Sequence, residues 1–128
     1  MRKRRFIATV VTLIPLILLS HCGQGEIASD DIIGVWKTSE PTYADRSFEI
    51  TKERITFGIG EGKFDIHYIK KIRVKQFPQD KSSLYTIYYE GNDGEEYTFA
   101  FYYYHENRGI IRLKNQRQIE WEKERVKR

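Results

Sequence analysis

Cysteine is almost absent from this chain, and methionine and proline are scarce. Its 128 residues include one cysteine, Cys22, one methionine and three prolines. A single cysteine cannot form a disulfide within the chain, so the fold must be held together by a packed core. Aromatic residues can supply that core, because the chain has nine tyrosines, seven phenylalanines and two tryptophans.

Long apolar stretches are also lacking, apart from one near the N-terminus. Basic residues at positions 2–5 precede an apolar run from Phe6 to Leu19, and a short polar segment follows. The run is shorter than the roughly 20 apolar residues that a membrane-spanning helix needs, and Pro15 interrupts it. The order of basic, apolar and polar zones is typical of a cleaved secretory signal. We therefore expect residues 1–21 to be a signal peptide.

The segment around Cys22 resembles a bacterial lipoprotein signal. In that family a large aliphatic residue precedes, at a fixed spacing, a cysteine that is acylated and becomes the mature N-terminus, and Leu19, Ser20 and Cys22 fit this pattern. The resemblance implies a lipid-anchored protein of the bacterial cell envelope. Gly23 after the cysteine resembles the class sent to the periplasmic face of the outer membrane. The family has a small residue where this chain has His21, so the alternative is an ordinary secretory signal in which Cys22 has no role.

An excess of basic charge is absent once the signal peptide is set aside. The chain has 22 lysines and arginines against 18 aspartates and glutamates, and four of the basic residues precede Cys22. Removing those four leaves 18 basic residues, which balance the 18 acidic ones. The net charge of +4 therefore comes from the signal peptide and gives no indication of a nucleic-acid partner.

Helical periodicity is missing before the last dozen or so residues, and short β-prone runs alternate with turn residues. Eight strands are expected, at residues 33–38, 46–51, 54–59, 63–76, 84–90, 95–104, 109–114 and 117–123. Short connections force neighbouring strands to pair antiparallel, and closing the sheet removes its two exposed edges. We predict an all-β fold, a single small eight-stranded antiparallel up-and-down barrel. The barrel domain is expected at 32–123, after a flexible tether at 22–31 and before a charged tail at 124–128.

Alternation of apolar and polar residues assigns one face of each expected strand to the core. The residues assigned in this way include Phe48, Ile50, Ile55, Phe57, Tyr97, Phe99, Phe101, Tyr103, Ile119 and Trp121. The fourth strand is irregular, because Lys70 falls in the same phase as its apolar residues Phe64, Ile66, Tyr68, Ile72 and Val74. A bulge near Lys70 would turn the lysine outward, and the alternative is a lysine that points into a cavity.

Gly34-Val35-Trp36 opens the first expected strand, and this motif before an eight-strand meander resembles the lipocalin superfamily of small-ligand barrels. In those folds the tryptophan closes one barrel end and packs under a basic residue near the last strand. The resemblance implies that Trp36 packs under Arg117, with Arg112 as the second candidate. The resemblance names a fold and not a ligand. Our leading hypothesis is a barrel without catalysis or cofactor that binds a small apolar ligand or an envelope component.

Residue patterns typical of enzymes are missing. His21 belongs to the signal peptide, and the sequence identifies no partner for His67 or His105. Asp65 and His67 share one face of the fourth strand, which is either the beginning of a metal site or an exposed pair. No serine lies in a nucleophile-elbow pattern. We therefore expect no catalytic site and no bound metal.

Tyrosine occupies both faces of the fifth and sixth expected strands. Tyr88, Tyr102 and Tyr104 fall on the outer face. An exposed aromatic face is suited to protein contact or glycan stacking, although tyrosine also favours strands in general. The alternative function is therefore a protein-interaction module, an inhibitor or an assembly accessory, in which the barrel is filled and this face or the loops bind the partner.

Replacing Cys22 with alanine tests the lipid anchor. If Cys22 is acylated, the Cys22→Ala protein should leave the membrane fraction, because more than one acyl chain is needed for stable anchoring and all of them would be lost. Its mass should also fall by more than the side-chain change. Membrane fractionation and intact-mass measurement check both expectations. Unchanged membrane association, with no mass difference beyond the substitution, would show that no lipid is attached.

Overall fold

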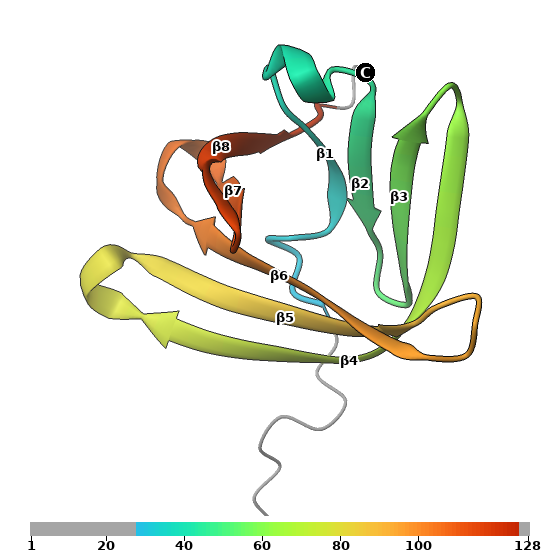
Figure 1. Ribbon diagram of the computed structural model, residues 1–128. Coiled ribbons are helices and arrows are strands. Elements are labelled where there is room, and N and C mark those ends of the chain that lie inside the picture. Colours follow the sequence, from blue (N-terminus) through green and yellow to red (C-terminus); the bar gives the residue numbers. More distant parts are fainter. Residues whose placement is uncertain (1–27, 126–128) are drawn as a thin grey trace, which may run out of the picture.

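The computed structural model describes residues 28–125, and within them eight strands close into one barrel (Figure 1). The strands are β1 (Gly34–Lys37), β2 (Arg46–Ile50), β3 (Arg54–Gly60), β4 (Lys63–Phe77), β5 (Ser82–Glu90), β6 (Glu96–Tyr104), β7 (Ile110–Leu113) and β8 (Gln116–Lys123). Three short 3₁₀ helices lie in the connections, η1 (Pro41–Tyr43), η2 (Pro78–Asp80) and η3 (Glu106–Arg108). Each strand begins and ends within two residues of its predicted position. The predicted signal peptide and Cys22 lie outside the described residues.

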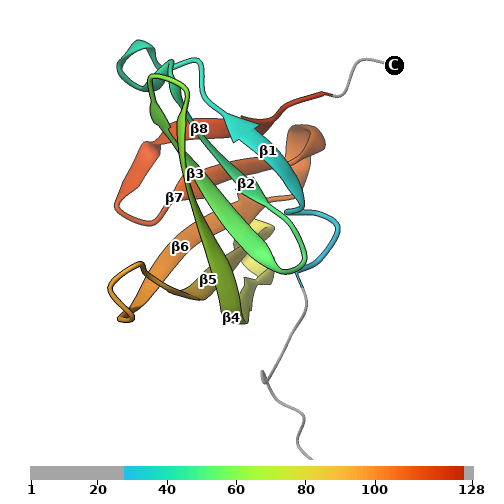
Figure 2. The ribbon, with the colours of Figure 1, turned by 90° about the vertical axis from the view of Figure 1, so that its right-hand side faces the viewer.

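Each strand pairs antiparallel with its neighbour in sequence, and β8 returns to β1, which confirms the predicted up-and-down barrel (Figures 1 and 2). The seam between β1 and β8 is the shortest, and Trp36 lies opposite Lys123 within it. The Glu124 amide extends this seam by donating to the Val35 carbonyl at 2.7 Å. None of the helices within residues 28–125 has the length and apolar character needed to cross a membrane.

Aromatic rings occupy the middle of the barrel. The centroid of the Phe48 ring lies 5.1 Å from that of Phe99 and 5.2 Å from that of Trp121. Tyr85 stacks on Phe101 at 5.4 Å. These side chains take the inner phase of their strands, and burying one of them stabilises the fold by roughly 1.5–3 kcal/mol. The buried core also includes Ile32, Trp36, Ile50, Ile55, Ile72, Ile87, Tyr103, Ile111 and Ile119.

A segment before β1 closes one end of the barrel. Ala28 and Ile32 are buried, and the Trp36 indole N–H donates to the Ile32 carbonyl at 2.9 Å. The hydroxyls of Ser29 and Tyr85 lie 3.1 Å apart. The last residues of the predicted tether therefore pack on the barrel.

The cation beside Trp36 differs from the one that the lipocalin resemblance implied. Lys123 Nζ lies 5.4 Å from the centre of the Trp36 ring. Arg117 instead lies 4.5 Å from the ring of Tyr102 on the outer face, and Arg112 also lies outside, in an ion pair of its own. The reason is the register of the closing seam, which places the end of β8, and not its beginning, opposite Trp36.

The opposite end of the barrel is only partly covered. The η1 helix places Tyr43 against Trp121, with ring centroids 6.3 Å apart. The Gln116 side-chain amide donates to the Tyr43 hydroxyl at 2.9 Å. Tyr43 thus covers the side next to β8, whereas a pocket opens on the other side, between β4 and the β5–β6 turn.

The long strand β4 contains a bulge. Its register against β5 shifts between Ile69 and Lys71, which leaves Lys70 as an extra residue. The Lys70 ammonium lies 3.7 Å from a carboxylate oxygen of Glu96 and is half exposed. The predicted bulge is therefore confirmed, and Lys70 does not point into a cavity.

The same bulge makes the predicted core assignment of the first half of β4 wrong. One extra residue reverses which alternate side chains face inward. Phe64, Ile66 and Tyr68 consequently lie outside, with exposed fractions of 62%, 55% and 69%. Ile72, beyond the bulge, is buried as predicted, and Val74 near the strand end is 38% exposed.

Two isoleucine-to-alanine substitutions, one on each side of the bulge, test this change of phase. Ile72→Ala removes a buried side chain and should lower the free energy of unfolding by about 2–5 kcal/mol. Ile66→Ala removes the same atoms from an exposed position and should change that free energy by less than about 0.5 kcal/mol. Chemical denaturation of the two variants gives both values. A loss at Ile66 as large as the loss at Ile72 would mean that β4 keeps one phase throughout.

Candidate functional site

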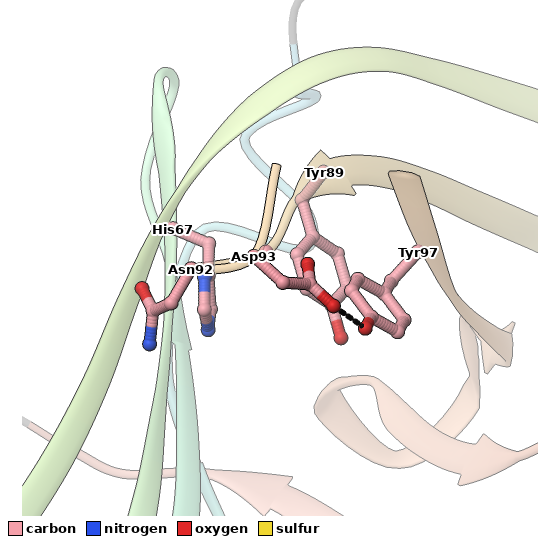
Figure 3. Close-up of a pocket in the computed structure, with 6 residues that line it drawn as sticks. His67, Tyr89, Asn92, Asp93 and Tyr97 are labelled. Atoms are coloured by element: carbon pink, nitrogen blue, oxygen red, sulfur yellow. Dashed lines mark hydrogen bonds between the residues drawn. The ribbon is translucent and has the colours of Figure 1, made fainter. Parts of the chain in front are cut away.

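A pocket of about 340 Å³ opens between β4 and the turn that joins β5 to β6. It is lined by His67 from β4, Tyr89 from β5, Gly91, Asn92 and Asp93 from the turn, and Tyr97 from β6. Figure 3 shows the two tyrosine rings side by side, with Asp93 beside them and His67 next to Asn92. We refer to these six residues as the mouth pocket.

The turn from Gly91 to Gly94 positions the polar residues of the mouth pocket. The Gly94 amide donates to the Gly91 carbonyl at 3.0 Å, and the Gly91 amide donates to the Glu95 carbonyl at 2.8 Å. Gly94 has a φ of 81°, a left-handed conformation that glycine adopts without strain. The Glu95 amide also donates to Asp93 Oδ1 at 2.9 Å, which fixes the carboxylate over the turn.

Gly91 leaves room for the ring of Tyr97. A Cβ atom at position 91 would lie 2.4 Å from Tyr97 Cε2, far inside van der Waals contact. Any other side chain at this position would therefore push Tyr97 away from the turn. The absence of a side chain at Gly91 is what allows the ring to line the pocket.

Asp93 and Tyr97 form a strongly hydrogen-bonded pair. The Tyr97 hydroxyl donates to Asp93 Oδ2 at 2.5 Å, a short bond to a charged acceptor. This bond, together with the bond from the Glu95 amide, lowers the pKa of the Asp93 carboxyl below its ordinary value. The same bond raises the pKa of the Tyr97 hydroxyl, because loss of its proton would place two negative charges side by side. At neutral pH the pair therefore holds one negative charge.

Three rings of the mouth pocket form a continuous row. The His67 centroid lies 4.9 Å from that of Tyr89, which lies 5.9 Å from that of Tyr97 with an angle of 25° between the planes. Phe57 supports the row from the inside, 5.7 Å from Tyr89, and itself contacts Phe99 of the core at 5.2 Å. The row is thus an extension of the core, and it presents a preorganised aromatic surface.

His67 has a defined hydrogen-bonding role in this row. Its Nδ1 lies 3.2 Å from the Glu90 carbonyl oxygen, which can only accept, so Nδ1 carries the proton. In the neutral ring Nε2 is then an acceptor. His67 therefore adds one directional polar group to the aromatic surface.

The mouth pocket is acidic in character. Burial raises the pKa of the Tyr89 hydroxyl, and the nearby Asp65 carboxylate raises it further. Asp93 accepts hydrogen bonds from a hydroxyl and an amide, and within residues 28–125 it forms no ion pair, whereas the nearby Glu96 is paired with Lys70. The arrangement consequently favours neutral or cationic groups over anionic ones.

His67 lines the mouth pocket, and Asp65, in the same phase of β4, lies near enough to act electrostatically on Tyr89, because the bulge reverses the phase of this half of the strand. Within residues 28–125, no three His, Cys, Asp or Glu side chains lie together in a way that could hold a metal ion. His105 lies elsewhere, 4.8 Å from the ring of Tyr103. The side chains of the mouth pocket offer stacking and hydrogen bonding.

The predicted outer tyrosines do share one face. Tyr88, Tyr102 and Tyr104 project outward from β5 and β6, and each has a basic side chain over its ring. None of them belongs to the mouth pocket. Tyr97, which alternation assigned to the core, is 43% exposed in the pocket because it is the second residue of β6 and lies at the rim of the barrel. The residues Asn92-Asp93-Gly94, which are typical of a tight hairpin turn, lie just before it in the sequence and are a local indication of this position.

Tyr97→Phe tests the hydrogen-bonded pair, since it removes the hydroxyl and keeps the ring. Without this donor, the pKa of Asp93 should rise toward the ordinary carboxyl value of about 3.9. A depressed folded-state pKa contributes stability that is present above the unfolded-state pKa and is lost as the pH falls through the folded-state pKa, so the variant should have a smaller contribution of this kind at neutral pH. NMR titration of the Asp93 carboxyl measures the change, and Tyr68→Phe on exposed β4 is the control. Equal Asp93 pKa values in both variants would show that the bond does not form.

No protein-family model, no curated protein and no solved structure matches this chain. The closed barrel of eight antiparallel strands is compatible with the lipocalin-like fold that Gly34-Val35-Trp36 resembles. A barrel fold of this kind names neither a ligand nor a partner. The side chains of the mouth pocket are therefore the basis for assigning a function.

Proposed function

We propose that this protein is a non-enzymatic, lipocalin-like binding protein whose ligand is a small molecule with a flat, largely apolar face. The observation that carries the proposal is the row of His67, Tyr89 and Tyr97 at the open side of the barrel. Rings that are already held by packing can stack on a flat partner, and each such contact contributes about 0.5–1.5 kcal/mol beyond area burial. Little side-chain freedom is lost on binding, which favours affinity.

The ligand is expected at the mouth and not in the centre of the barrel. The centre is occupied by Phe48 and Phe101, which are both buried and have ring centroids 6.4 Å apart. The mouth pocket, at about 340 Å³, falls at the lower end of the range of about 300–1,000 Å³ for small-molecule sites. Its size suits a compact molecule and not a long acyl chain.

Polar groups at the rim would orient the ligand. His67 Nε2 and the Asp93 carboxylate accept hydrogen bonds, and the Asn92 amide both donates and accepts. Asp65 and Asp93 together disfavour an anionic ligand such as a free fatty acid. The favoured ligand is thus neutral or cationic, with an apolar ring face and hydrogen-bond donors on its edge.

We further infer that the barrel is exported and held by a lipid on Cys22 at the periplasmic face of the outer membrane. The support is the order of basic, apolar and polar residues before Cys22, together with the resemblance to a lipoprotein signal. An anchored barrel would bind an envelope component, or a small molecule that enters the envelope, close to the membrane.

A second candidate function is favoured by a different surface. Phe64, Ile66 and Tyr68 form an outer strip on β4, and each side chain is more than half exposed. Exposed apolar clusters mark sites of protein contact. In this alternative the protein is an interaction module, an inhibitor or an assembly accessory, and the strip binds another envelope protein.

Native mass spectrometry of the protein purified from its own membranes tests the mouth pocket. The protein should carry a noncovalent small-molecule adduct. Tyr89→Ala should weaken its retention at least about tenfold, because the substitution removes the central ring of the row. Tyr88→Ala is the matched control, since this neighbouring residue of β5 projects from the opposite face and should leave the adduct bound.

Equal retention by Tyr89→Ala and the unmodified protein would contradict the mouth pocket as the binding site. Recovery of a bound protein instead of a small molecule would favour the interaction module. That protein should then be lost with Ile66→Ser and kept with Tyr89→Ala, because Ile66 belongs to the outer strip and Tyr89 does not.

A further inference from the structure

A second surface, distinct from the mouth pocket, combines basic and aromatic side chains. It extends over the outer face of the sheet from the second half of β4 across β5 and β6 to the beginning of β8. We term it the basic face, and it comprises Lys71, Arg73 and Lys75 of β4, Tyr88 of β5, Tyr102 of β6 and Arg117 of β8. The bulge at Lys70 separates it from the mouth pocket along β4.

The strand register arranges this surface as cations on either side of an uncharged band. Lys71, Arg73 and Lys75 form a column along β4, with side chains about 7 Å apart along the strand. Arg117 lies on the far side, over Tyr102. The band between them contains Leu84, Thr86 and Tyr88 of β5 and Thr98, Ala100 and Tyr102 of β6.

Aromatic rings hold the cations in place. Lys71 Nζ lies 4.5 Å from the centre of the Tyr88 ring, and the Arg73 guanidinium lies 5.7 Å from the same ring. Arg117 lies 4.5 Å from the centre of the Tyr102 ring. Contacts of this kind fix the side chains without cancelling their charge, so the charge remains available to a partner.

The cations of this face are not neutralised by ion pairs within the described residues, although Asp80 lies close enough to Arg117 to act on it electrostatically. Within residues 28–125, neither the β4 column nor Arg117 forms an ion pair, whereas Lys70, directly before the column, is paired with Glu96. Basic and acidic residues are balanced after the signal peptide. Asp65 and Asp93 lie at the mouth and Glu96 is paired with Lys70, so the column on β4 keeps its positive charge although basic and acidic residues are equal in number over residues 22–128.

We propose that the basic face docks on a membrane surface rich in anionic phospholipids. The phosphate groups of such a surface complement cations that form no ion pair within residues 28–125, and each lysine or arginine near it strengthens binding about fivefold. These cations lie on the open face of a sheet and not in a cleft, so their partner is a surface and not a single small anion. Tyr88 and Tyr102 suit the same partner, because tyrosine favours the headgroup region of a membrane.

Docking through the basic face would obstruct neither the mouth pocket at one end of the barrel nor the connection to Cys22 at the other. The mouth pocket would stay free, since it lies at the end of β5 and across the bulge from the basic column. Ser29 contacts Tyr85 near the beginning of β5, and Cys22 precedes Ala28 by six residues. At most about 22 Å of chain therefore separates Cys22 from the barrel. The docking proposal nevertheless requires neither the mouth-pocket ligand nor the lipid.

Vesicle cosedimentation of the full chain carrying Cys22→Ala tests the basic face without any acyl anchor. Vesicles of phosphatidylcholine with phosphatidylglycerol are compared with vesicles of phosphatidylcholine alone. Lys71→Gln, Arg73→Gln and Lys75→Gln together should lower the partition coefficient on the anionic vesicles about 100-fold and leave that on the neutral vesicles unchanged. The basic residues at positions 2–5 and the apolar run at residues 6–19 are common to all variants, so the difference between variants reports the charge of the basic face.

The matched control neutralises Lys52, Arg54 and Lys63, which are exposed on the other side of the bulge, and it should retain most of the binding. An equal loss in this control would overturn the proposal. Binding of the unmodified basic face to anionic vesicles must also weaken as salt is added, and salt-independent binding would overturn it without any variant. Binding to soluble heparin, with no preference for anionic over neutral vesicles, would assign the face to a polyanionic glycan and not to a membrane.

Discussion

Strand β4 contains one extra residue, Lys70, which reverses the alternation of the strand. Side chains in the phase that faces outward before Lys70 face the barrel interior after it. Before it, His67 lines the mouth pocket, and after it, Ile72 is buried in the core. The extra residue also lets a strand of 15 residues bend, so that its first half pairs with β3 and its second half with β5 (Figure 1). The mouth pocket lies beside the first half of β4, where this strand is not paired with β5.

The same bend separates two surfaces of opposite charge. The mouth pocket has acidic groups, among them Asp93, whose charge is stabilised by hydrogen bonds from Tyr97 and the Glu95 amide. The outer face of the second half of β4 carries a basic column that includes Arg73 and Lys75. Residues 22–128 have no net excess of either charge, so strand phase and not composition produces both surfaces. The proposed ligand and the proposed anionic surface would therefore occupy separate places on one small barrel.

The eight strands and their antiparallel order were predictable because short connections leave neighbouring strands no other pairing. The orientation of the first half of β4 was not predictable. Phe64, Ile66 and Tyr68 alternate with polar residues in the same way whether their face is buried or exposed. Only pairing with a strand distant in sequence decides between the two. The partner of Trp36 depends on the register of the closing seam, and Tyr97 enters the pocket because Gly91 leaves room for its ring. Both features depend on three-dimensional contacts, which produce no periodic pattern in the sequence.

Amide hydrogen exchange along β4, followed by NMR, tests most directly whether the bulge leaves the first half of this strand with one free edge. The Ile69 amide donates to the Glu53 carbonyl at 2.9 Å, so the alternate amides of His67 and Asp65 also face β3. The Ile66 amide faces the opposite edge, where β5 has already turned away. We predict fast exchange at Ile66 between slowly exchanging neighbours. Equally slow exchange at all three amides would mean that β4 is paired on both sides along its length, and would contradict the arrangement of the mouth pocket.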